Sequence, residues 1–278
     1  MARLPAAEWT QREGLAQLVA ALGAENIRWV GGAVRDTLLG ESVADVDAAT
    51  TLLPEQVIEK LDAGTIKSVP TGIEHGTVTA VLPGGTVEIT TLRRDVATDG
   101  RRATIAYASD WREDAARRDF TINALYADPL TLEISDYFGG LQDLETRRVR
   151  FIGDARQRIR EDHLRILRYY RFQARFGSLL DGEAEEACAE LAPMLKGLSR
   201  ERVAMELLNL LGLPDPRETV ERMHRRGVLP VVLPETGPAG LAAFEGLLDA
   251  ERQAEIAPAA LRRLAALERQ RITDDYNA

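Results

Sequence analysis

Apolar and polar positions in the first half of the chain follow two different periods. Residues 8–23 carry apolar side chains at helical spacing, with Leu15, Leu18, Val19 and Leu22 on one stripe. Shorter segments alternate with period two or run apolar over a few residues, as strands do. Together these patterns predict helices over residues 8–23, 34–39, 54–63 and 114–126, and strands over residues 27–30, 43–49, 77–82 and 87–92.

Turn signals and a change of pattern divide the rest of the chain. Pro83-Gly84-Gly85 predicts a hairpin between the last two strands, and the polar, arginine-rich residues 93–103 predict a mobile loop. From Asp154 onward no strand pattern remains. Periodicity there predicts helices over residues 155–175, 183–192, 200–211, 216–226 and 238–268. The sequence therefore predicts the α+β class, with a small mixed sheet in residues 1–140 followed by an all-α region.

Composition narrows the class of protein. Hydrophobic residues make up 45% and charged residues 28% of the 278 residues, which is ordinary for a globular protein. No apolar stretch approaches the roughly 20 residues of a membrane-spanning helix, so we expect no membrane partner. Residues 1–15 lack the apolar core of a secretory signal. Cys188 is the single cysteine, which excludes an intrachain disulfide and a thiolate zinc cluster. We therefore expect a cytoplasmic protein.

Charge is unevenly distributed along the chain. The net charge of −9 argues weakly against binding a polyanion. Residues 147–175, however, contain ten arginines against three acidic residues, which is +10 − 3 = +7. Local positive charge matters more for nucleic-acid binding than the total, because phosphate contacts release counterions locally. An excess of arginine over lysine can also result from the base composition of a genome, so it is not by itself evidence of function.

Gly31 and Gly32 follow the predicted strand 27–30 and begin the next predicted helix. Glycine lets a backbone approach a ligand closely, and free N–H groups at a helix start suit a phosphate. Arg35 could add a charge-assisted contact. The alternative is a tight strand-to-helix turn without any ligand, which this motif taken alone favours.

Asp45 and Asp47 stand two positions apart in the predicted strand 43–49, so both carboxylates should project from one face. Adjacent carboxylates repel unless a cation lies between them, and oxygen ligands suit Mg²⁺. Two such ions, about 3.5–4 Å apart, can activate an attacking hydroxyl and stabilise a leaving pyrophosphate. Glu88, in the predicted strand 87–92, could add a carboxylate. The alternative is a polar strand edge, because the D-x-D pattern is common.

Arg118, Asp119 and Asn123 lie in the predicted helix 114–126. Asp119 and Asn123 would share one helix face, where they could hold a ribose hydroxyl while Arg118 binds a phosphate. An ordinary hydrogen-bonded helix surface is the alternative.

A second acidic and basic group falls in the predicted helix 155–175. Glu161, Asp162, Arg165 and Arg168 would occupy about a third of its circumference. A carboxylate beside a guanidinium can read a base edge, and a good bidentate pair gives about 1–3 kcal/mol of discrimination. Cytosine and adenine both present an amine beside an acceptor. A surface ion pair between Glu161 and Arg165, worth about 0.3–0.5 kcal/mol, is the alternative.

The motifs GGAVRD, DVD, VEITTLRRD, RRDFTINAL and EDHLRILRYYRF occur in this order. Together they resemble the class II tRNA nucleotidyltransferase and bacterial poly(A) polymerase family over about residues 28–212. The resemblance implies a catalytic head over residues 1–140 and a helical neck that recognises the base over residues 141–228. Residues 229–278 would then begin a helical body.

The resemblance also implies a role for each matching residue. Asp45 and Asp47 correspond to the catalytic pair that binds two Mg²⁺ ions, and Glu88 falls where the family has a further carboxylate. The family's triphosphate-binding turn corresponds to Gly31, Gly32 and Arg35. The segment that favours a ribonucleotide corresponds to Arg118, Asp119 and Asn123. The protein template that pairs with the incoming base corresponds to Asp162 and Arg165, with Arg168 beside them. Residues 199–202 correspond to a neck motif that steadies the template.

The implied activity is CCA addition to the 3′ end of a tRNA from CTP and ATP, with release of pyrophosphate. Residues 95–102 resemble a flexible loop of enzymes that complete C, C and A. Family members usually continue well beyond Leu267, so we expect a truncated form with a weakened grip on tRNA. The sequence favours no particular oligomeric state.

Two other interpretations stay open. A poly(A) polymerase on the same scaffold would accept ATP alone, and the loop argues against it. A non-catalytic RNA-binding remnant or an engineered scaffold would not need Asp45, Asp47, Asp162 and Arg165, which are all present.

Overall fold

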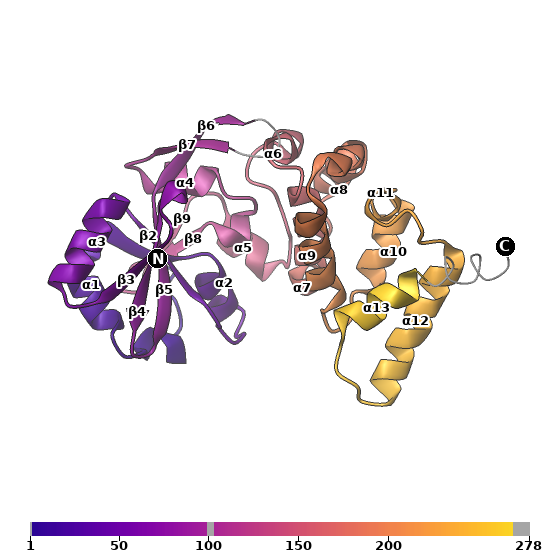
Figure 1. Ribbon diagram of the computed structural model, residues 1–278, viewed down its shortest axis with the longest axis horizontal. Helices are drawn as coiled ribbons and strands as arrows, with labels where there is room; N and C mark the ends of the chain where they lie inside the picture. Colours follow the sequence, from indigo (N-terminus) through magenta and orange to yellow (C-terminus); the bar gives the residue numbers. More distant parts are fainter. Residues whose placement is uncertain (1, 99–102, 269–278) are drawn as a thin grey trace. The chain divides into compact units, whose positions relative to one another are not determined.

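The computed structural model describes residues 2–98 and 103–268 (Figure 1). These residues form two compact units. The described part of the first unit comprises residues 2–98, 103–146 and 150–153, and that of the second comprises residues 147–149 and 154–268.

The first unit is built on a seven-stranded sheet in the order β3-β4-β5-β2-β1-β8-β9. Its strands are β1 (Ile27–Val30), β2 (Val46–Thr50), β3 (Lys67–Gly72), β4 (Thr77–Leu82), β5 (Gly85–Thr91), β8 (Leu125–Ala127) and β9 (Ile134–Asp136). β2 and β5 run parallel, whereas the other neighbouring pairs are antiparallel. The sheet is therefore mixed, and β2 lies near its centre.

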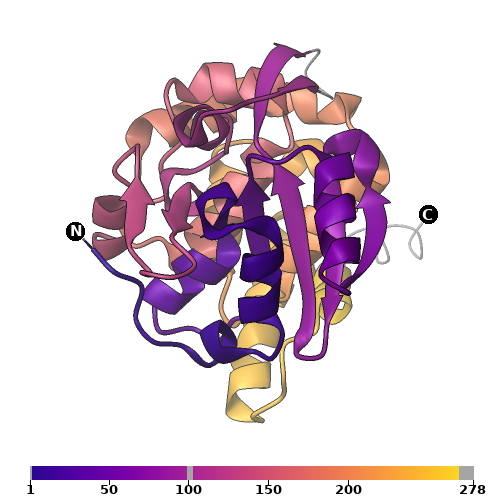
Figure 2. The same ribbon diagram turned by 90° about the vertical axis from the view of Figure 1, so that its left-hand side faces the viewer.

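Helices cover this sheet and bury its apolar side chains. They are α1 (Leu15–Leu22), α2 (Gly32–Leu38), α3 (Pro54–Ala63), α4 (Trp111–Ala116) and α5 (Gly140–Glu145), with short 3-10 turns η1 (Glu8–Gln11), η2 (Ala24–Asn26), η3 (Ile73–His75) and η4 (Thr121–Asn123). In Figure 2, α1 and α3 lie in front of the strands. The predicted apolar stripe of α1 is confirmed, because Leu18 and Leu22 are fully buried. Each such leucine contributes about 1.5–3 kcal/mol by leaving water.

Two predictions at the start of this unit and in its middle are wrong. The predicted helix 8–23 is interrupted at Gly14, whose left-handed φ of 90° ends the first turn before α1 begins. The predicted loop 93–103 is instead largely a ribbon of β6 (Arg93–Thr98) and β7 (Ala103–Tyr107). Antiparallel pairing satisfies the hydrogen bonds of the backbone whatever the polarity of the side chains. Because the arginines interrupt the apolar pattern, the sequence did not predict these strands. Residues 99–102 of the predicted loop lie outside the described residues.

The predicted helix 114–126 is also wrong. α4 ends at Ala116, the backbone is extended at Phe120, and the segment finishes as β8. Tyr126 and Ala127 pair with β1, and Phe120 bridges to Phe151. Strand pairing with distant segments therefore overrides the local helical pattern.

The second unit is helical, and its described residues contain no strand, as predicted. Its helices are α6 (Ala155–Glu161), α7 (Arg165–Phe176), α8 (Gly182–Leu191), α9 (Arg200–Leu211), α10 (Arg217–Arg225), α11 (Leu229–Val232), α12 (Pro238–Gln253) and α13 (Ala260–Leu267), with the 3-10 turn η5 (Ala192–Gly197). α7 packs against α9 and α10, and α13 packs against α9 and α12. None of the helices in the described residues is long and apolar enough to span a membrane.

Two long predicted helices are each divided in this unit. The predicted helix 155–175 breaks at Asp162, which is extended at φ −151° and ψ 108°. The predicted helix 238–268 breaks after Gln253, where Glu255 takes a left-handed φ of 52°. There the Ile256 N–H donates to the Glu251 carbonyl at 2.8 Å, the bond that closes a Schellman motif.

Candidate active site

The centre of the sheet brings two carboxylates side by side. Asp47 is the second residue of β2, opposite Val30 on β1 and opposite Glu88 on β5. Opposed residues of neighbouring strands project from one face, so Asp47 and Glu88 share that face. Asp47 is half-buried and Glu88 is exposed. The predicted convergence of Asp47 and Glu88 is therefore consistent with the strand register.

Asp45 lies outside the strand, contrary to the sequence analysis. The prediction placed both aspartates in a strand over residues 43–49, whereas β2 begins at Val46. Asp45 is exposed in the non-regular segment just before the strand. Asp45 nevertheless lies two residues before Asp47 in the chain, and its charge raises the pKa of the Asp47 carboxyl.

The charges around Asp47 fit a divalent cation. Burial raises the pKa of the Asp47 carboxyl, and the charge of Glu88 raises it further; Arg118 acts in the opposite direction, and Asp45 raises the pKa again. The described residues contain no group of three or more His, Cys, Asp or Glu side chains placed to hold a metal. Mg²⁺, however, is often bound by only one or two carboxylates together with substrate phosphates. Two carboxylates that bind the ion, with substrate phosphates completing its ligands, therefore fit.

A glycine turn lies directly against this carboxylate. Gly31 has φ 71° and ψ −127°, which an L side chain rarely adopts, and it immediately precedes α2. A Cβ built on Gly31 would lie 4.0 Å from Asp47 Oδ2 and 3.6 Å from Arg118 Nη1. The turn thus brings bare backbone, an anionic group and a cationic group together, as a metal-bound triphosphate requires.

Arg35, Asn123 and Asp119 form a buried chain of hydrogen bonds. The Arg35 Nη1 donates to Asn123 Oδ1 at 2.6 Å, and Asn123 Nδ2 donates to Asp119 Oδ1 at 3.0 Å. Arg35 Nε also donates to the carboxylate of Asp36 at 2.8 Å. Asp119 and Asn123 do meet, but Asp119 lies before the 3-10 turn η4 and Asn123 ends it, so they do not share the face of one α-helix as predicted. A Cβ on Gly32 would lie 3.8 Å from Arg35 Nη2, which places this network beside the turn.

A further buried group, which the sequence analysis missed, holds Arg118. Asp114 accepts hydrogen bonds from Arg117 Nε at 2.8 Å, Arg118 Nη2 at 3.2 Å and the Tyr126 hydroxyl at 2.6 Å. Burial alone would raise the pKa of Asp114, but the guanidiniums of Arg118 and Arg117, the Tyr126 hydroxyl and the Arg93 N–H lower it to about 2. The available signal was the spacing of Asp114 and Arg118, which an i,i+4 ion pair would show.

Replacing Asp114 by asparagine should destabilise the first unit by about 3 kcal/mol. Breaking a buried ion pair leaves its cations uncompensated, although both guanidiniums here reach some solvent. The folded-state pKa of Asp114 is depressed from 3.8 to about 2, so its contribution is present above pH 4 and is lost as the pH falls toward 2. Urea unfolding at pH 7 and at pH 2.5 should therefore show a larger difference between parent and variant at pH 7. Equal differences at both pH values would contradict this role.

In the second unit the predicted base-reading residues surround a helix break. Arg165 Nη1 donates to Glu161 Oε2 at 2.7 Å and to the Arg158 carbonyl at 2.8 Å, across the end of α6. The ion pair between Glu161 and Arg165 therefore exists, with each side chain 13% exposed. Arg168 Nη1 lies 3.6 Å from Glu206 Oε1. The prediction of one continuous helix face is wrong.

Asp162 is held at this break by two contacts. Its carboxylate accepts from Arg202 Nη2 at 2.9 and 3.2 Å and from the Leu164 N–H at 3.1 Å. Arg202 lies in the first turn of α9, whose N-cap is Ser199. The segment 199–202, for which a structural role was predicted, thus provides an anchor for Asp162.

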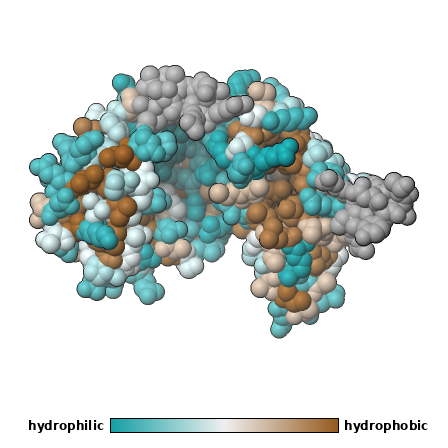
Figure 3. All heavy atoms as spheres, viewed as in Figure 1, coloured by the Kyte–Doolittle hydropathy of each residue, from teal (hydrophilic) through white to brown (hydrophobic). Residues whose placement is uncertain are grey.

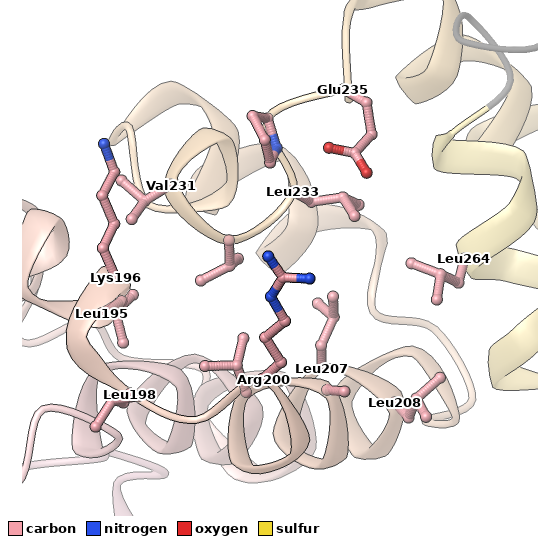
Figure 4. A pocket seen from close by; sticks show the side chains of 14 residues that line it. Leu195, Lys196, Leu198, Arg200, Leu207, Leu208, Val231, Leu233, Glu235 and Leu264 are labelled. Carbon is pink, nitrogen blue, oxygen red and sulfur yellow. The ribbon is translucent and has the colours of Figure 1, made fainter. Parts of the chain in front are cut away.

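The second unit also contains an apolar pocket, which is lined by none of Glu161, Asp162, Arg165 and Arg168. It has a volume of about 550 Å³ and lies among η5, α9, α11 and α13. Figure 4 shows Arg200 and Leu207 rising from α9 toward Leu233. Apolar side chains also gather on the right-hand side of Figure 3, which shows this unit. We assign no part of the chemistry to this pocket.

Known protein families match both units of the chain. A family profile described as "Poly A polymerase head domain" matches residues 27–150, and one described as "Probable RNA and SrmB- binding site of polymerase A" matches residues 180–239. The human "CCA tRNA nucleotidyltransferase 1, mitochondrial" is 46% identical over 205 residues, which are 72% of this chain and 47% of the human protein. The "CCA-adding enzyme" of Geobacillus stearothermophilus is 40% identical over 188 residues, 67% of this chain and 45% of that enzyme.

Solved structures show the same similarity. The "Bacillus stearothermophilus CCA-adding enzyme in complex with CTP" is 36% identical, with a TM-score of 0.70 over 86% of this chain and 56% of that chain. The "Thermotoga maritima CCA-adding enzyme complexed with tRNA_CCA" is 26% identical, with a TM-score of 0.75 over 91% of this chain and 61% of that chain. The chain spans about half the length of the curated relatives it matches.

The paired carboxylates on a mixed sheet and the two matched profiles are features of the nucleotidyltransferase class of proteins. Enzymes of this class generally use divalent metal ions. More specifically, the chain belongs to the family of class II CCA-adding tRNA nucleotidyltransferases and bacterial poly(A) polymerases.

Proposed function

We propose that the chain adds CMP and AMP from CTP and ATP to the 3′ end of a tRNA and releases pyrophosphate. The observation that carries this proposal is the placement of Asp47 between the Gly31 turn and Glu88. The names of the curated relatives and solved structures support CCA addition over other nucleotidyl transfers. Because the chain spans about half of those relatives, the tRNA substrate is part of the proposal.

The proposed reaction is an in-line displacement at the α-phosphate. The 3′-oxygen of the RNA forms a new bond to the α-phosphorus, the bond from that phosphorus to the bridging oxygen breaks, and pyrophosphate leaves with that oxygen. Two Mg²⁺ ions, held by Asp45 and Asp47, would lower the pKa of the 3′-hydroxyl and neutralise the triphosphate. The hydroxyl proton passes to solvent.

The remaining residues of the first unit would bind and orient the nucleotide. The bare backbone at Gly31 and Gly32 would admit the triphosphate, and Arg118, held by Asp114, would place a positive charge beside it. The buried pair of Asp119 and Asn123 would contact the ribose. Catalysis would come mainly from this positioning and charge neutralisation.

We propose that residues of the second unit select the base of the incoming nucleotide. Asp162 would accept from the exocyclic amine of cytosine or adenine, and Arg165 would donate to the neighbouring acceptor. Each is already fixed by a second group, Asp162 by Arg202 and Arg165 by Glu161. Fixed side chains lose less entropy when they bind, which favours their use as a protein template.

The direct test is incubation with a tRNA that lacks CCA, with Mg²⁺ and each labelled nucleotide in turn. We expect CMP to be added first and AMP only after two cytidines, with no incorporation of UMP or GMP. Repeated AMP addition without CMP would instead identify a poly(A) polymerase. No addition of any nucleotide by the folded chain would contradict the proposal and favour a non-catalytic RNA-binding role.

The cytoplasmic location expected from the sequence stays a prediction. Some of the similar proteins carry the word mitochondrial in their names. Fractionation of the source cells, with detection of the chain in each fraction, would distinguish the two compartments.

A further inference from the structure

The segment that precedes Asp45 has little packing of its own. Glu41, Ser42 and Ala44 are exposed, and Val43 is only half-buried. Asp45 lies outside β2, so the hydrogen bonds of the sheet do not fix it. Part of the segment also lines an open pocket of about 630 Å³, so packing supports it incompletely.

Arg12 contacts this segment at its backbone. Its Nη2 donates to the Ala44 carbonyl at 3.1 Å and to the Val43 carbonyl at 3.3 Å. Among the described residues, Arg12 is the side chain that donates hydrogen bonds to these two carbonyls. The Ala44 carbonyl belongs to the peptide bond that leads into Asp45. Because one guanidinium nitrogen is shared by both carbonyls, Arg12 restrains the path of the chain at that point.

The residues on either side of Arg12 are themselves held by hydrogen bonds. The Gly84 N–H donates to the carbonyl of Glu13, the next residue, at 3.2 Å and so attaches the N-terminal segment to the β4–β5 hairpin. Three residues before Arg12, Trp9 Nε1 donates to the Thr37 hydroxyl of α2 at 2.7 Å. The segment thus touches both the helix that follows the glycine turn and the hairpin that ends in β5. Because this segment is held at two places, Arg12 restrains the Val43 and Ala44 carbonyls from a fixed position.

We propose that Arg12 is a positioning residue for metal binding: by holding the carbonyls of Val43 and Ala44 it keeps the Asp45 carboxylate beside Asp47. The proposal rests on the metal assignment in the proposed function. Outer groups that orient metal ligands typically change metal affinity by about 10–100-fold when they are replaced. Arg12 touches neither the metal nor the substrate, so its effect passes entirely through Asp45.

The test measures Mn²⁺ binding to the whole chain, by the electron paramagnetic resonance signal of free Mn²⁺, without nucleotide or tRNA. We expect Arg12→Gln to raise the Kd for Mn²⁺ about 10-fold with little change in Tm. Arg12→Lys should recover part of the affinity, because its ammonium can reach one carbonyl. The matched control is Arg28→Gln. Arg28 also donates to two carbonyls, those of Ala24 and Ile27, but stands away from the Asp47 end of β1.

An unchanged Kd in Arg12→Gln would overturn the proposal. So would an equal rise in Arg28→Gln, since general loosening of the unit would then account for both. If Arg12→Gln does not fold, Arg12→Lys decides: parental Mn²⁺ affinity together with a lowered Tm would assign Arg12 a purely structural role. Asp45→Asn separates this result from the proposed function. If Asp45→Asn binds Mn²⁺ like the parent, the metal assignment and the Arg12 proposal fail together. If it loses binding but the parent adds no nucleotide, the proposed function alone fails.

Discussion

Replacing Asp47 by asparagine should lower the rate of nucleotide addition by at least about 10²–10³-fold, the range found when one preorganised charge-stabilising group is removed. Asparagine keeps the size of the side chain and one oxygen but cannot balance a divalent cation. The measurement is incorporation of one labelled CMP into a tRNA that lacks CCA, at saturating CTP and Mg²⁺. A parental rate in Asp47→Asn would remove the metal assignment.

The same change should not destabilise the fold at neutral pH. The folded-state pKa of Asp47 lies above its ordinary value because of burial and of the charge on Glu88. The folded state therefore keeps this proton at pH values where the unfolded state has released it, and stability falls as the pH rises through that window. The asparagine side chain cannot ionise, so this loss is absent from the variant. Urea unfolding at pH 7 should give a free energy of unfolding for Asp47→Asn that is equal to or greater than that of the parent.

Asp62→Asn is the matched control for both measurements. Asp62 lies on α3 with an exposed side chain, in the same unit as Asp47. Its replacement should change neither the rate of CMP addition nor, beyond about 0.5 kcal/mol, the free energy of unfolding. A variant at Asp47 that is both inactive and clearly destabilised would indicate a structural carboxylate and not a metal ligand.

Elements bounded by strong local signals were predicted to the residue. β1, α3, β4 and α9 agree with their predicted limits. In α3, Pro54 occupies the first helical position and the apolar spacing is regular. The apolar run of β1 ends at a glycine, and Ser199 caps α9. Each of these signals lies within a few residues of the boundary it marks.

Elements decided by distant partners were not predicted. Residues 114–126 have a helical pattern, but Tyr126 pairs with Val30 and turns the end of that segment into a strand. Asp162 lies in a pattern that continues on both sides, and the break there is accompanied by a bond to Arg202, 40 residues away. A local stretch of sequence of the length used to predict a helix or strand does not contain both members of either pair.

The candidate site divides in the same way. Asp47 and Gly31 could be named as candidates from the sequence because the D-x-D spacing and the glycine pair are local, and the structure places them side by side. Asp114 and Arg12 were missed because their importance comes from the groups they reach, Arg118 in one case and the Val43 and Ala44 carbonyls in the other. Residues that position a site are thus harder to find in a sequence than residues that form it.

Replacing Asp162 by alanine should relax the choice of base by about 5- to 150-fold, the equivalent of the 1–3 kcal/mol of a good bidentate contact. The quantity to measure is the ratio of kcat/KM for CTP to kcat/KM for UTP on a tRNA that lacks CCA. Uracil presents an acceptor where cytosine presents its amine, so removal of the carboxylate should weaken CTP use and remove the repulsion against UTP. Mn²⁺ binding should stay at the parental value, because Asp162 holds no metal in this scheme.

Arg202→Gln tests how Asp162 is presented. This variant keeps the carboxylate but removes the charged group that donates to it at 2.9 Å. We expect a smaller loss of selectivity than in Asp162→Ala, with the KM for CTP changed more than kcat, since a mobile carboxylate still binds but binds less often in register. Arg156→Gln, which breaks an ion pair with Glu190 on the same unit, is the matched control and should leave the ratio unchanged. If Arg202→Gln and Asp162→Ala lost selectivity equally, Arg202 would itself be reading the base. If neither lost any, the pair would be a structural tie between the break after α6 and the start of α9, and the base would have to be read elsewhere.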